Sequence, residues 1–197
     1  MATPVYGLVL AGGQSCRMQQ DKAFLQYHDQ PQYLHTYFLL QQVCSEVFLS
    51  CRPDQLAQFR KLHPEIPLIL DLYEDIGPMA ALLSAFQAHE VAWLTLACDM
   101  PFMDVPTMRD LLLHRDPSVL ATTYQLGRQD FPETMCTIWE PGSFLPLQEA
   151  RERQRYSLTR YLKQQNVIIL EPSNADALKN INTPGEYREA VRIMGQG

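Results

Sequence analysis

Short apolar runs alternate along the whole chain with longer segments of helical periodicity. The apolar runs predict strands at residues 5–10, 46–50, 67–70, 93–97, 118–124 and 167–170, together with an extended stretch at 133–139. The segments between them predict helices at residues 32–43, 54–62, 78–89, 106–114, 143–153, 157–164 and 184–194. Several of these helices have a proline at or near the first turn, where proline is favoured.

Strands separated by helical segments of this length are typical of βαβ units. They predict a mostly parallel, Rossmann-like sheet with helices on both faces, a three-layer α/β/α sandwich. The 197 residues suit one domain, which we expect to span 1–197. In such folds ligands bind beyond the carboxyl ends of the strands. Polar motifs follow three of the predicted strands, at residues 11–22, 71–78 and 98–101, so functional side chains are expected there.

Composition narrows the class of protein. The formal net charge of −6 argues against a nucleic-acid-binding surface, which needs a basic face. No apolar run approaches the ~18 residues of a membrane span, and the N-terminal residues lack the basic region of a secretory signal, so we expect a cytoplasmic protein. The five cysteines are scattered without a C-x-x-C pair, which predicts free, packed thiols rather than disulfides or a zinc cluster.

The stretch after the first strand, LAGGQSCRMQQDK at residues 10–22, carries candidate chemistry. Gly12 and Gly13 allow the backbone to approach an anion closely, and Arg17 and Lys22 supply two cations that suit a triphosphate. The stretch has neither the P-loop pattern nor the G-x-G-x-x-G dinucleotide pattern. A tight turn with solvated Arg17 and Lys22 is the alternative. We interpret the stretch as a phosphate-binding loop.

This loop resembles the signature L-A-G-G-x-S-x-R-M-x-x-D-K of nucleotidyltransferases, and specifically of the molybdenum cofactor guanylyltransferase family. The resemblance continues in the family's order through GPMAA at 77–81, CDMP at 98–101, FPE at 131–133 and NINTP at 180–184. It implies transfer of GMP from GTP to the terminal phosphate of molybdopterin. Pyrophosphate would leave, the product would be molybdopterin guanine dinucleotide, and Mg²⁺ is the implied metal.

The resemblance also implies a set of site residues. Asp99, directly after a predicted strand, would hold Mg²⁺, which needs only one or two carboxylates when substrate phosphates complete its coordination. The catalytic residues would be Arg17, Lys22 and Asp99. The residues implied at GTP are Leu10, Ala11, Gly12, Gly13, Lys22, Ser50, Asp71, Gly77, Pro78 and Asp99. The Asp71 carboxylate suits the N1–H and amino donors of guanine, although capping a turn is an alternative. Cys98 is interpreted as a packed thiol rather than a nucleophile.

The residues predicted to contact the acceptor, molybdopterin, are supported by weaker sequence patterns. The arginines at 151, 153, 155 and 160 form a dense basic cluster, for which a solvated helix face is the alternative. Within it we predict that Arg155 and Ser157 face molybdopterin. Asn180 and Asn182 are interpreted as caps of the last helix or, by family analogy, as acceptor contacts. A labile acceptor would favour transient docking to molybdenum cofactor insertion proteins.

Two positions of this chain depart from the family pattern, and two other functions are alternatives to GMP transfer. Gln19 and Ala81 stand where the family usually has glycine, and a positive φ at either position would cost about 1 kcal/mol or more.

Relatives that transfer CMP tend to have L-A-A-G where this chain has L-A-G-G, so Gly12, which leaves room for a purine, favours GTP. A non-catalytic GTP- or pterin-binding delivery module would not need Arg17, Lys22 and Asp99 together.

Overall fold

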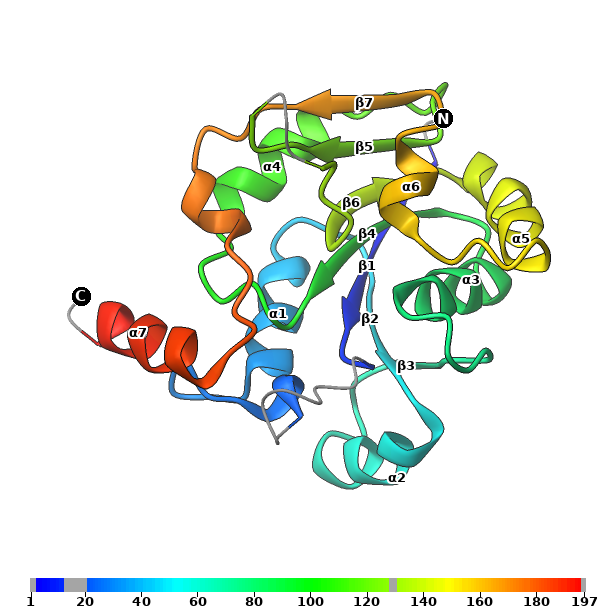
Figure 1. The fold of residues 1–197 in the computed structure, drawn as a ribbon. Helices are drawn as coiled ribbons and strands as arrows, with labels where there is room; N and C mark the ends of the chain where they lie inside the picture. Colours follow the sequence, from blue (N-terminus) through cyan, green and yellow to red (C-terminus); the bar gives the residue numbers. More distant parts are fainter. Residues whose placement is uncertain (1–2, 13–20, 128–130, 196–197) are drawn as a thin grey trace.

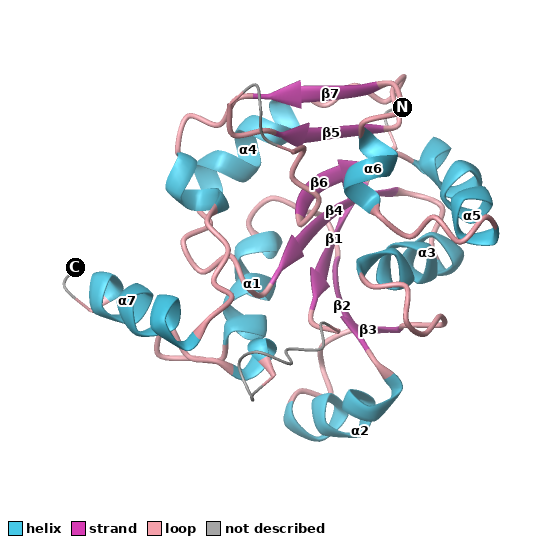
Figure 2. Ribbon diagram, in the orientation of Figure 1, coloured by secondary structure: helices cyan, strands magenta, loops and turns pink. Residues whose placement is uncertain are grey.

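The computed structural model describes residues 3–12, 21–127 and 131–195, and within them it has a seven-stranded sheet with helices on both faces (Figures 1 and 2). The strand order is β3-β2-β1-β4-β6-β5-β7. The strands are β1 (Val5–Leu10), β2 (Val47–Cys51), β3 (Leu68–Leu70), β4 (Ala92–Ala97), β5 (Ala121–Tyr124), β6 (Cys136–Trp139) and β7 (Val167–Leu170). The predicted three-layer sandwich is confirmed.

Strand direction follows the connections. β1 pairs in parallel with β2 and β4, β2 with β3, and β5 with β7. β6 is the exception, because it is antiparallel to both β4 and β5. No helix separates β5 from β6 in the described residues, and without such a crossover the chain turns back on itself. The pattern at 133–139 predicted an extended stretch but not this reversal.

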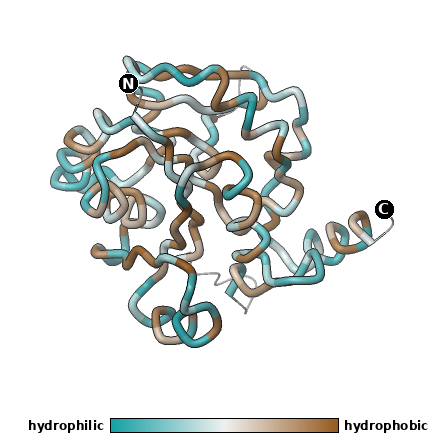
Figure 3. The backbone as a smooth tube through the Cα atoms, turned by 180° about the vertical axis from the view of Figure 1, so that it is seen from behind, coloured by the Kyte–Doolittle hydropathy of each residue, from teal (hydrophilic) through white to brown (hydrophobic). Residues whose placement is uncertain are grey.

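Successive side chains of the central strands face different layers. Val9 and Leu94 belong to the core beneath α1 (Gln32–Gln41), α2 (Pro53–Leu62) and α4 (Val105–Leu113). Leu8 and Trp93 belong to the opposite core, beneath α3 (Pro78–Ala88), α5 (Phe144–Glu152) and α6 (Leu158–Leu162). All four side chains are fully buried, so the register of β1 against β4 is strongly specified. Figure 3 shows the apolar strands at the centre and more polar segments around them.

The observed elements differ from the predictions mainly at their ends. The strand predicted from residue 118 begins at Ala121, because Asp116 accepts a hydrogen bond from the Ser118 amide and makes a turn there. In the described part of the chain, three short 3₁₀ segments were not predicted: η1 (Lys22–Phe24), η2 (Pro141–Ser143) and η3 (Ala175–Leu178). Ala81 lies inside helix α3, so alanine carries no backbone strain there. Among the described helices, none has both the length and the apolar character to cross a membrane.

Helix α7 (Pro184–Met194) extends away from the sandwich (Figure 1). A small apolar cluster ties it to the body, with Leu25 and Tyr27 packed against Ile181 and Ala190. The Tyr187 hydroxyl also donates a hydrogen bond to the Gln26 carbonyl oxygen at 2.9 Å. The segment before α7 is therefore held against the chain that follows η1, close to the carboxyl ends of the strands.

A buried ion pair lies at the end of the sheet where the parallel strands β1 and β4 begin. Arg115 follows α4 and forms a two-point ion pair with Glu140 after β6, with Nε–Oε1 2.6 Å and Nη2–Oε2 2.8 Å. A third donor, Nη1, reaches the Thr3 carbonyl oxygen. The two side chains are 10% and 2% exposed. Removing one partner leaves the other charge buried without compensation, which is strongly destabilising.

We expect Arg115→Met to lower the free energy of unfolding by about 3–5 kcal/mol, measured by urea denaturation. Arg153→Met is the matched control, because its pair with Glu149 is 63% exposed on both sides and a surface pair contributes at most about 1 kcal/mol. Equal losses in the two variants would contradict a special role for the buried pair.

Candidate active site

A cleft of about 830 Å³ opens at the carboxyl ends of β1, β2, β3 and β4. Every residue predicted at GTP that the structure describes lines it: Leu10, Ala11, Gly12, Lys22, Ser50, Asp71, Gly77, Pro78 and Asp99. Gly13, Arg17 and Gln19 lie outside the described residues. The polar motifs after three separate strands therefore meet in one cleft, as expected for a parallel sheet.

Lys22 and Asp99 form an ion pair in this cleft. Lys22 begins η1 and Asp99 follows β4, and the distance from Lys22 Nζ to Asp99 Oδ2 is 3.0 Å. The same ammonium group donates to Asn182 Oδ1 at 2.6 Å. One residue earlier, the Ile181 amide donates to the Asp99 carbonyl oxygen at 2.8 Å. Residues 181 and 182 thus attach the C-terminal segment to both members of the pair.

The second carboxylate oxygen of Asp99 suggests where a metal ion would bind. Oδ1 is buried and has no hydrogen-bond partner among the described residues. A buried, unpaired carboxylate oxygen at the edge of a cleft suits a hard cation such as Mg²⁺. The described residues contain no group of three or more His, Cys, Asp and Glu side chains that could hold a metal unaided. Asp99 fits Mg²⁺ therefore only if substrate oxygens complete the coordination.

Gly12 and Asp71 are in direct contact across the cleft. A Cβ atom placed on Gly12 would lie 2.6 Å from Asp71 Oδ2, so a larger residue would force the carboxylate to move. Ser50 is fully buried, and its hydroxyl donates to Asp71 Oδ1 at 2.6 Å. Ser50 therefore positions Asp71. Burial raises the pKa of Asp71, although the Ser50 hydrogen bond and the nearby Arg52 charge lower it.

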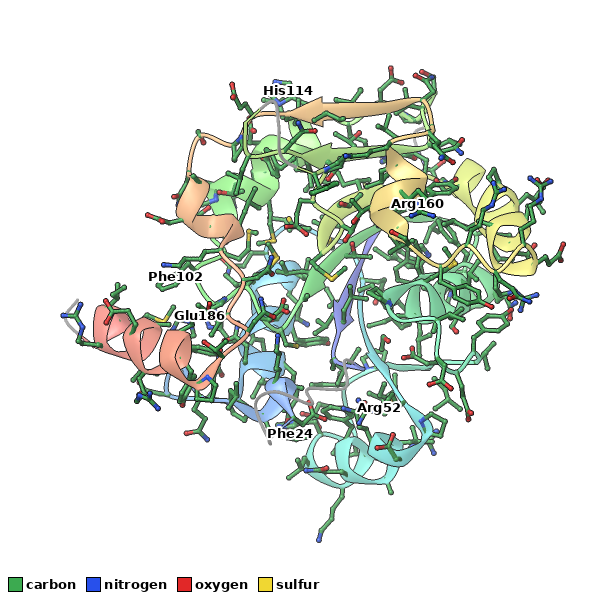
Figure 4. The ribbon with its side chains drawn as sticks, in the orientation of Figure 1. Phe24, Arg52, Phe102, His114, Arg160 and Glu186 are labelled. Atoms are coloured by element: carbon green, nitrogen blue, oxygen red, sulfur yellow. The ribbon has the colours of Figure 1, made fainter. Side chains whose placement is uncertain are left out.

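Arg52 and Gln55, at the start of α2, hold the loop after β1, a role the sequence analysis missed. Arg52 Nη1 donates to the Gly12 carbonyl oxygen at 2.7 Å, and Gln55 Nε2 donates to the Ala11 carbonyl oxygen at 3.1 Å. Both side chains also contact Asp21, just before η1. Figure 4 labels Arg52 and Phe24, and the Phe24 ring of η1 stacks on Phe59 of α2 with ring centres 5.2 Å apart. The sequence feature that could have identified Arg52 was its position directly after β2, where other cleft residues follow their strands.

The loop from Asp71 to Gly77 forms one wall of the cleft. Gly77 precedes α3 with φ +60° and ψ −145°, a conformation that essentially only glycine adopts. Asp75 also has a positive φ of 59°. Pro78 then begins the helix, so Gly77 and Pro78 place the start of α3 at the cleft, as the sequence predicted.

Two other titratable groups lie near Asp99. Cys98 is buried, and burial raises the pKa of its thiol well above the usual value, which agrees with a packed thiol rather than a nucleophile. Burial is also the main cause that raises the pKa of Glu133, with the Asp99 charge adding to it. The Glu133 carboxylate accepts hydrogen bonds from the amides of Thr134 and Met135, so it shapes the turn into β6.

The residues predicted at the acceptor do not line this cleft. Arg155 is exposed, and Ser157 caps α6 by accepting a hydrogen bond from the Arg160 amide. Arg160 lies on α6, well apart from Arg52 in Figure 4. The arginine of this cluster that contacts a cleft residue is Arg151, whose guanidinium lies over the Tyr73 ring.

Comparisons with known proteins identify the family of this chain. Residues 7–169 match the family described as the MobA-like NTP transferase domain. A molybdenum cofactor biosynthesis bifunctional protein from Synechocystis is 35% identical over 94% of this chain, and the chain spans 53% of that protein's length. A probable molybdenum cofactor guanylyltransferase from Halalkalibacterium halodurans is 28% identical, over 93% of this chain and 96% of that protein.

Solved structures share the fold. A molybdopterin-guanine dinucleotide biosynthesis protein A from Archaeoglobus fulgidus superposes with a TM-score of 0.81, covering 98% of this chain and all of that one at 20% identity. A nucleotidyl transferase from Methanothermobacter gives a TM-score of 0.76 at 16% identity, covering 98% of each chain.

Partial burial of the Asp71 carboxylate predicts a pH-dependent stability. Its folded pKa is above the ordinary value, so the folded protein holds this proton more tightly and stability falls as pH rises from about 4 through that folded pKa. Asp71→Asn removes the buried charge. We expect urea denaturation to show the variant more stable than the wild type at pH 7, with a gain that shrinks toward pH 4.

Asp54→Asn is the opposite control for this prediction. A hydrogen bond from Arg52 is the main cause that lowers the pKa of Asp54, so its charged form adds stability above the ordinary pKa and that stability is lost as pH falls. The Asp54 variant is expected to be less stable than the wild type at pH 7. A pH-independent effect of Asp71→Asn would contradict the burial argument.

Proposed function

The chain belongs to the MobA-like NTP transferase family and is a nucleotidyltransferase, and on this premise we propose that it transfers GMP from GTP to molybdopterin. Pyrophosphate would be released, and the product would be molybdopterin guanine dinucleotide. The single observation that carries the proposal is the Lys22–Asp99 pair, at 3.0 Å, at the mouth of the cleft that Gly12 and Asp71 line. The relatives named as guanylyltransferases support the choice of acceptor and base.

In this reaction an oxygen of the molybdopterin phosphate attacks the α-phosphorus of GTP. The bond to the bridging oxygen breaks, and its electron pair leaves with pyrophosphate. The attacking phosphate is already anionic, so no protein nucleophile is needed, and Cys98 is buried. Catalysis therefore consists of positioning and charge neutralisation. Lys22 would leave Asp99 for the phosphates, and Arg17 would add a second cation to the same loop.

Asp99 is the residue among those described that would hold Mg²⁺, because its Oδ1 is buried and has no hydrogen-bond partner. When bound, the metal would supply positive charge for the triphosphate oxygens. Asn182 would keep Lys22 in reach of the cleft, because it accepts a hydrogen bond from the ammonium group.

Base choice is assigned to Gly12 and Asp71. Asp71 would accept hydrogen bonds from the N1–H and amino group of guanine, and its charged form is required for this. The Asp71 carboxylate occupies the space beside Gly12. A Cβ on residue 12 would lie only 2.6 Å from Asp71 Oδ2. Gly12 would therefore favour guanine by admitting Asp71, in addition to the room for a purine predicted from the sequence. An alanine there, as in CMP-transferring relatives, would displace the carboxylate.

The acceptor side stays a prediction. Asn180 and Asn182 flank Ile181, which is bonded to Asp99, so they lie closer to the cleft chemistry than the exposed Arg155 and Ser157. We propose that molybdopterin enters between this segment and the cleft. Transient docking to molybdenum cofactor insertion proteins and a cytoplasmic location remain predictions from the sequence.

A nucleotide panel tests the proposed function and its alternatives. We expect GTP with Mg²⁺ to raise the melting temperature by several degrees, because a ligand at 100 times its Kd stabilises a fold by about 2.7 kcal/mol. CTP, ATP and UTP serve as controls. A shift with CTP would support the cytidylyltransferase, and GTP binding without pyrophosphate release in the presence of molybdopterin would support the delivery module. No shift with any nucleotide would contradict both enzymatic assignments.

We expect Asp99→Asn to lower the rate of pyrophosphate release at least 100-fold, because the neutral amide is a much weaker metal ligand than the carboxylate and forms no ion pair with Lys22. Urea denaturation should show a stably folded variant, since Asp99 lies at the edge of the cleft. Asp104→Asn is the matched control, because Asp104 caps α4 and does not line the cleft. A near-normal rate in the Asp99 variant would remove Asp99 from the metal site.

A further inference from the structure

Tyr73, which lines the cleft two residues after Asp71, is held on two sides. Arg151, in the last turn of α5, places its guanidinium carbon 4.5 Å from the centre of the Tyr73 ring. Gln87, near the end of α3, donates a hydrogen bond from Nε2 to the Tyr73 hydroxyl. One aromatic side chain of the cleft wall thus joins two helices that are distant in sequence.

The loop around Tyr73 is anchored at other points as well. Asp71 is bonded to Ser50, and the Leu72 amide donates to Ser84 Oγ in α3 at 2.9 Å. Asp75 and Gly77, both with positive φ, turn the chain into α3. Tyr73 lies between these anchors, and Arg151 and Gln87 hold its side chain there. Arg151 is the contact in this set that comes from outside β2, the loop and α3.

We propose that Tyr73 forms the wall against which the nucleotide base lies, and that Arg151 is a positioning residue that holds the Tyr73 ring in place. This inference rests on the proposed function. Asp71 and Tyr73 lie on the same loop and line the same cleft, so a base bonded to Asp71 would lie within reach of the Tyr73 ring. Aromatic rings bind bases through contacts that do not depend on base identity, so Tyr73 adds affinity and Asp71 adds selectivity.

A second explanation for any effect of Arg151 is its charge. An arginine near the cleft mouth would attract a triphosphate whether or not it contacts Tyr73. The two explanations differ in one respect. Positioning through the ring requires Tyr73, whereas attraction by charge does not and weakens as salt is added. A double-mutant cycle separates them, because residues that act through one contact are not additive.

The test measures the binding of GTP with Mg²⁺ by calorimetry to the full chain and four variants. We expect Arg151→Ala to weaken binding about two- to fivefold, the size of a partly exposed cation–π contact. Tyr73→Ala should weaken it about tenfold. In the Tyr73→Ala/Arg151→Ala variant the arginine substitution should add nothing further. Arg153→Ala is the matched control, because it removes the same charge from the end of the same helix without touching Tyr73.

Steady-state rates provide a second readout. In Arg151→Ala the KM for GTP should rise while kcat stays within about twofold, because the base wall is remote from the transferred phosphorus. A loss of affinity that persists in the Tyr73→Ala background, or an equal loss in Arg153→Ala, would overturn the positioning role. A fall in kcat without a change in KM would overturn the proposal that the nucleotide base lies against Tyr73.

Hydrogen exchange keeps the inference testable if the proposed function fails. Without ligand, amides of residues 71–77 should exchange faster in Arg151→Ala than in the wild type or in Arg153→Ala. Unchanged exchange would overturn the contact's positioning role, whatever the protein binds. Failure of the wild type to bind GTP would instead contradict the proposed function and with it the base wall.

Discussion

The parallel pairing of β1 with β4 is the constraint on which the site depends. In this register Leu10 lies opposite Ala97, so the two strands end side by side. The next residues, Ala11 and Gly12 on one side and Cys98 and Asp99 on the other, therefore leave the sheet at the same point. A slip of one residue would turn the fully buried side chains of both strands to the wrong layer. Core packing thus sets the position of Asp99 relative to the loop after β1.

The two strand ends bring together two opposite charges, Lys22 and Asp99, which form an ion pair. Lys22 bonds to Asp99 and Asn182, and the Ile181 amide bonds to the Asp99 backbone. The proposed reaction requires Lys22 to exchange the carboxylate for phosphate oxygens. That exchange replaces one charge pair by another, so the ammonium group keeps a partner throughout. Because Asn182 accepts a hydrogen bond from the same ammonium group, the segment before α7 would be linked through Lys22 to the bound phosphates.

Much of this arrangement could be predicted from sequence, for local reasons. Apolar runs and helical periodicity are properties of short windows, and residues that follow strands of a parallel sheet must meet at one edge. The motifs that contain Asp71 and Asp99 were predicted at that edge on those grounds, whereas the roles of the two carboxylates came from the family resemblance. The reversal of β6 could not be predicted, because an extended stretch has the same pattern in either direction. The contacts of Arg52 with Gly12 and of Arg151 with Tyr73 join residues at least 40 positions apart, which no window reveals.

The residues that line the cleft include several that the fold alone would not select. A carboxylate at position 71 is partly buried beside Gly12, and the protein tolerates the rise in its pKa that burial causes. Asp75 and Gly77 adopt positive φ where an ordinary turn residue would avoid it. Asp99 keeps a buried oxygen without a partner among the described residues. The partly buried carboxylate, the positive φ of Asp75 and the unpaired oxygen of Asp99 each cost stability locally, and each lies where the proposed GTP would bind. Such features concentrate where a bound molecule supplies the missing partner, so their clustering in one cleft is itself an argument for a ligand there.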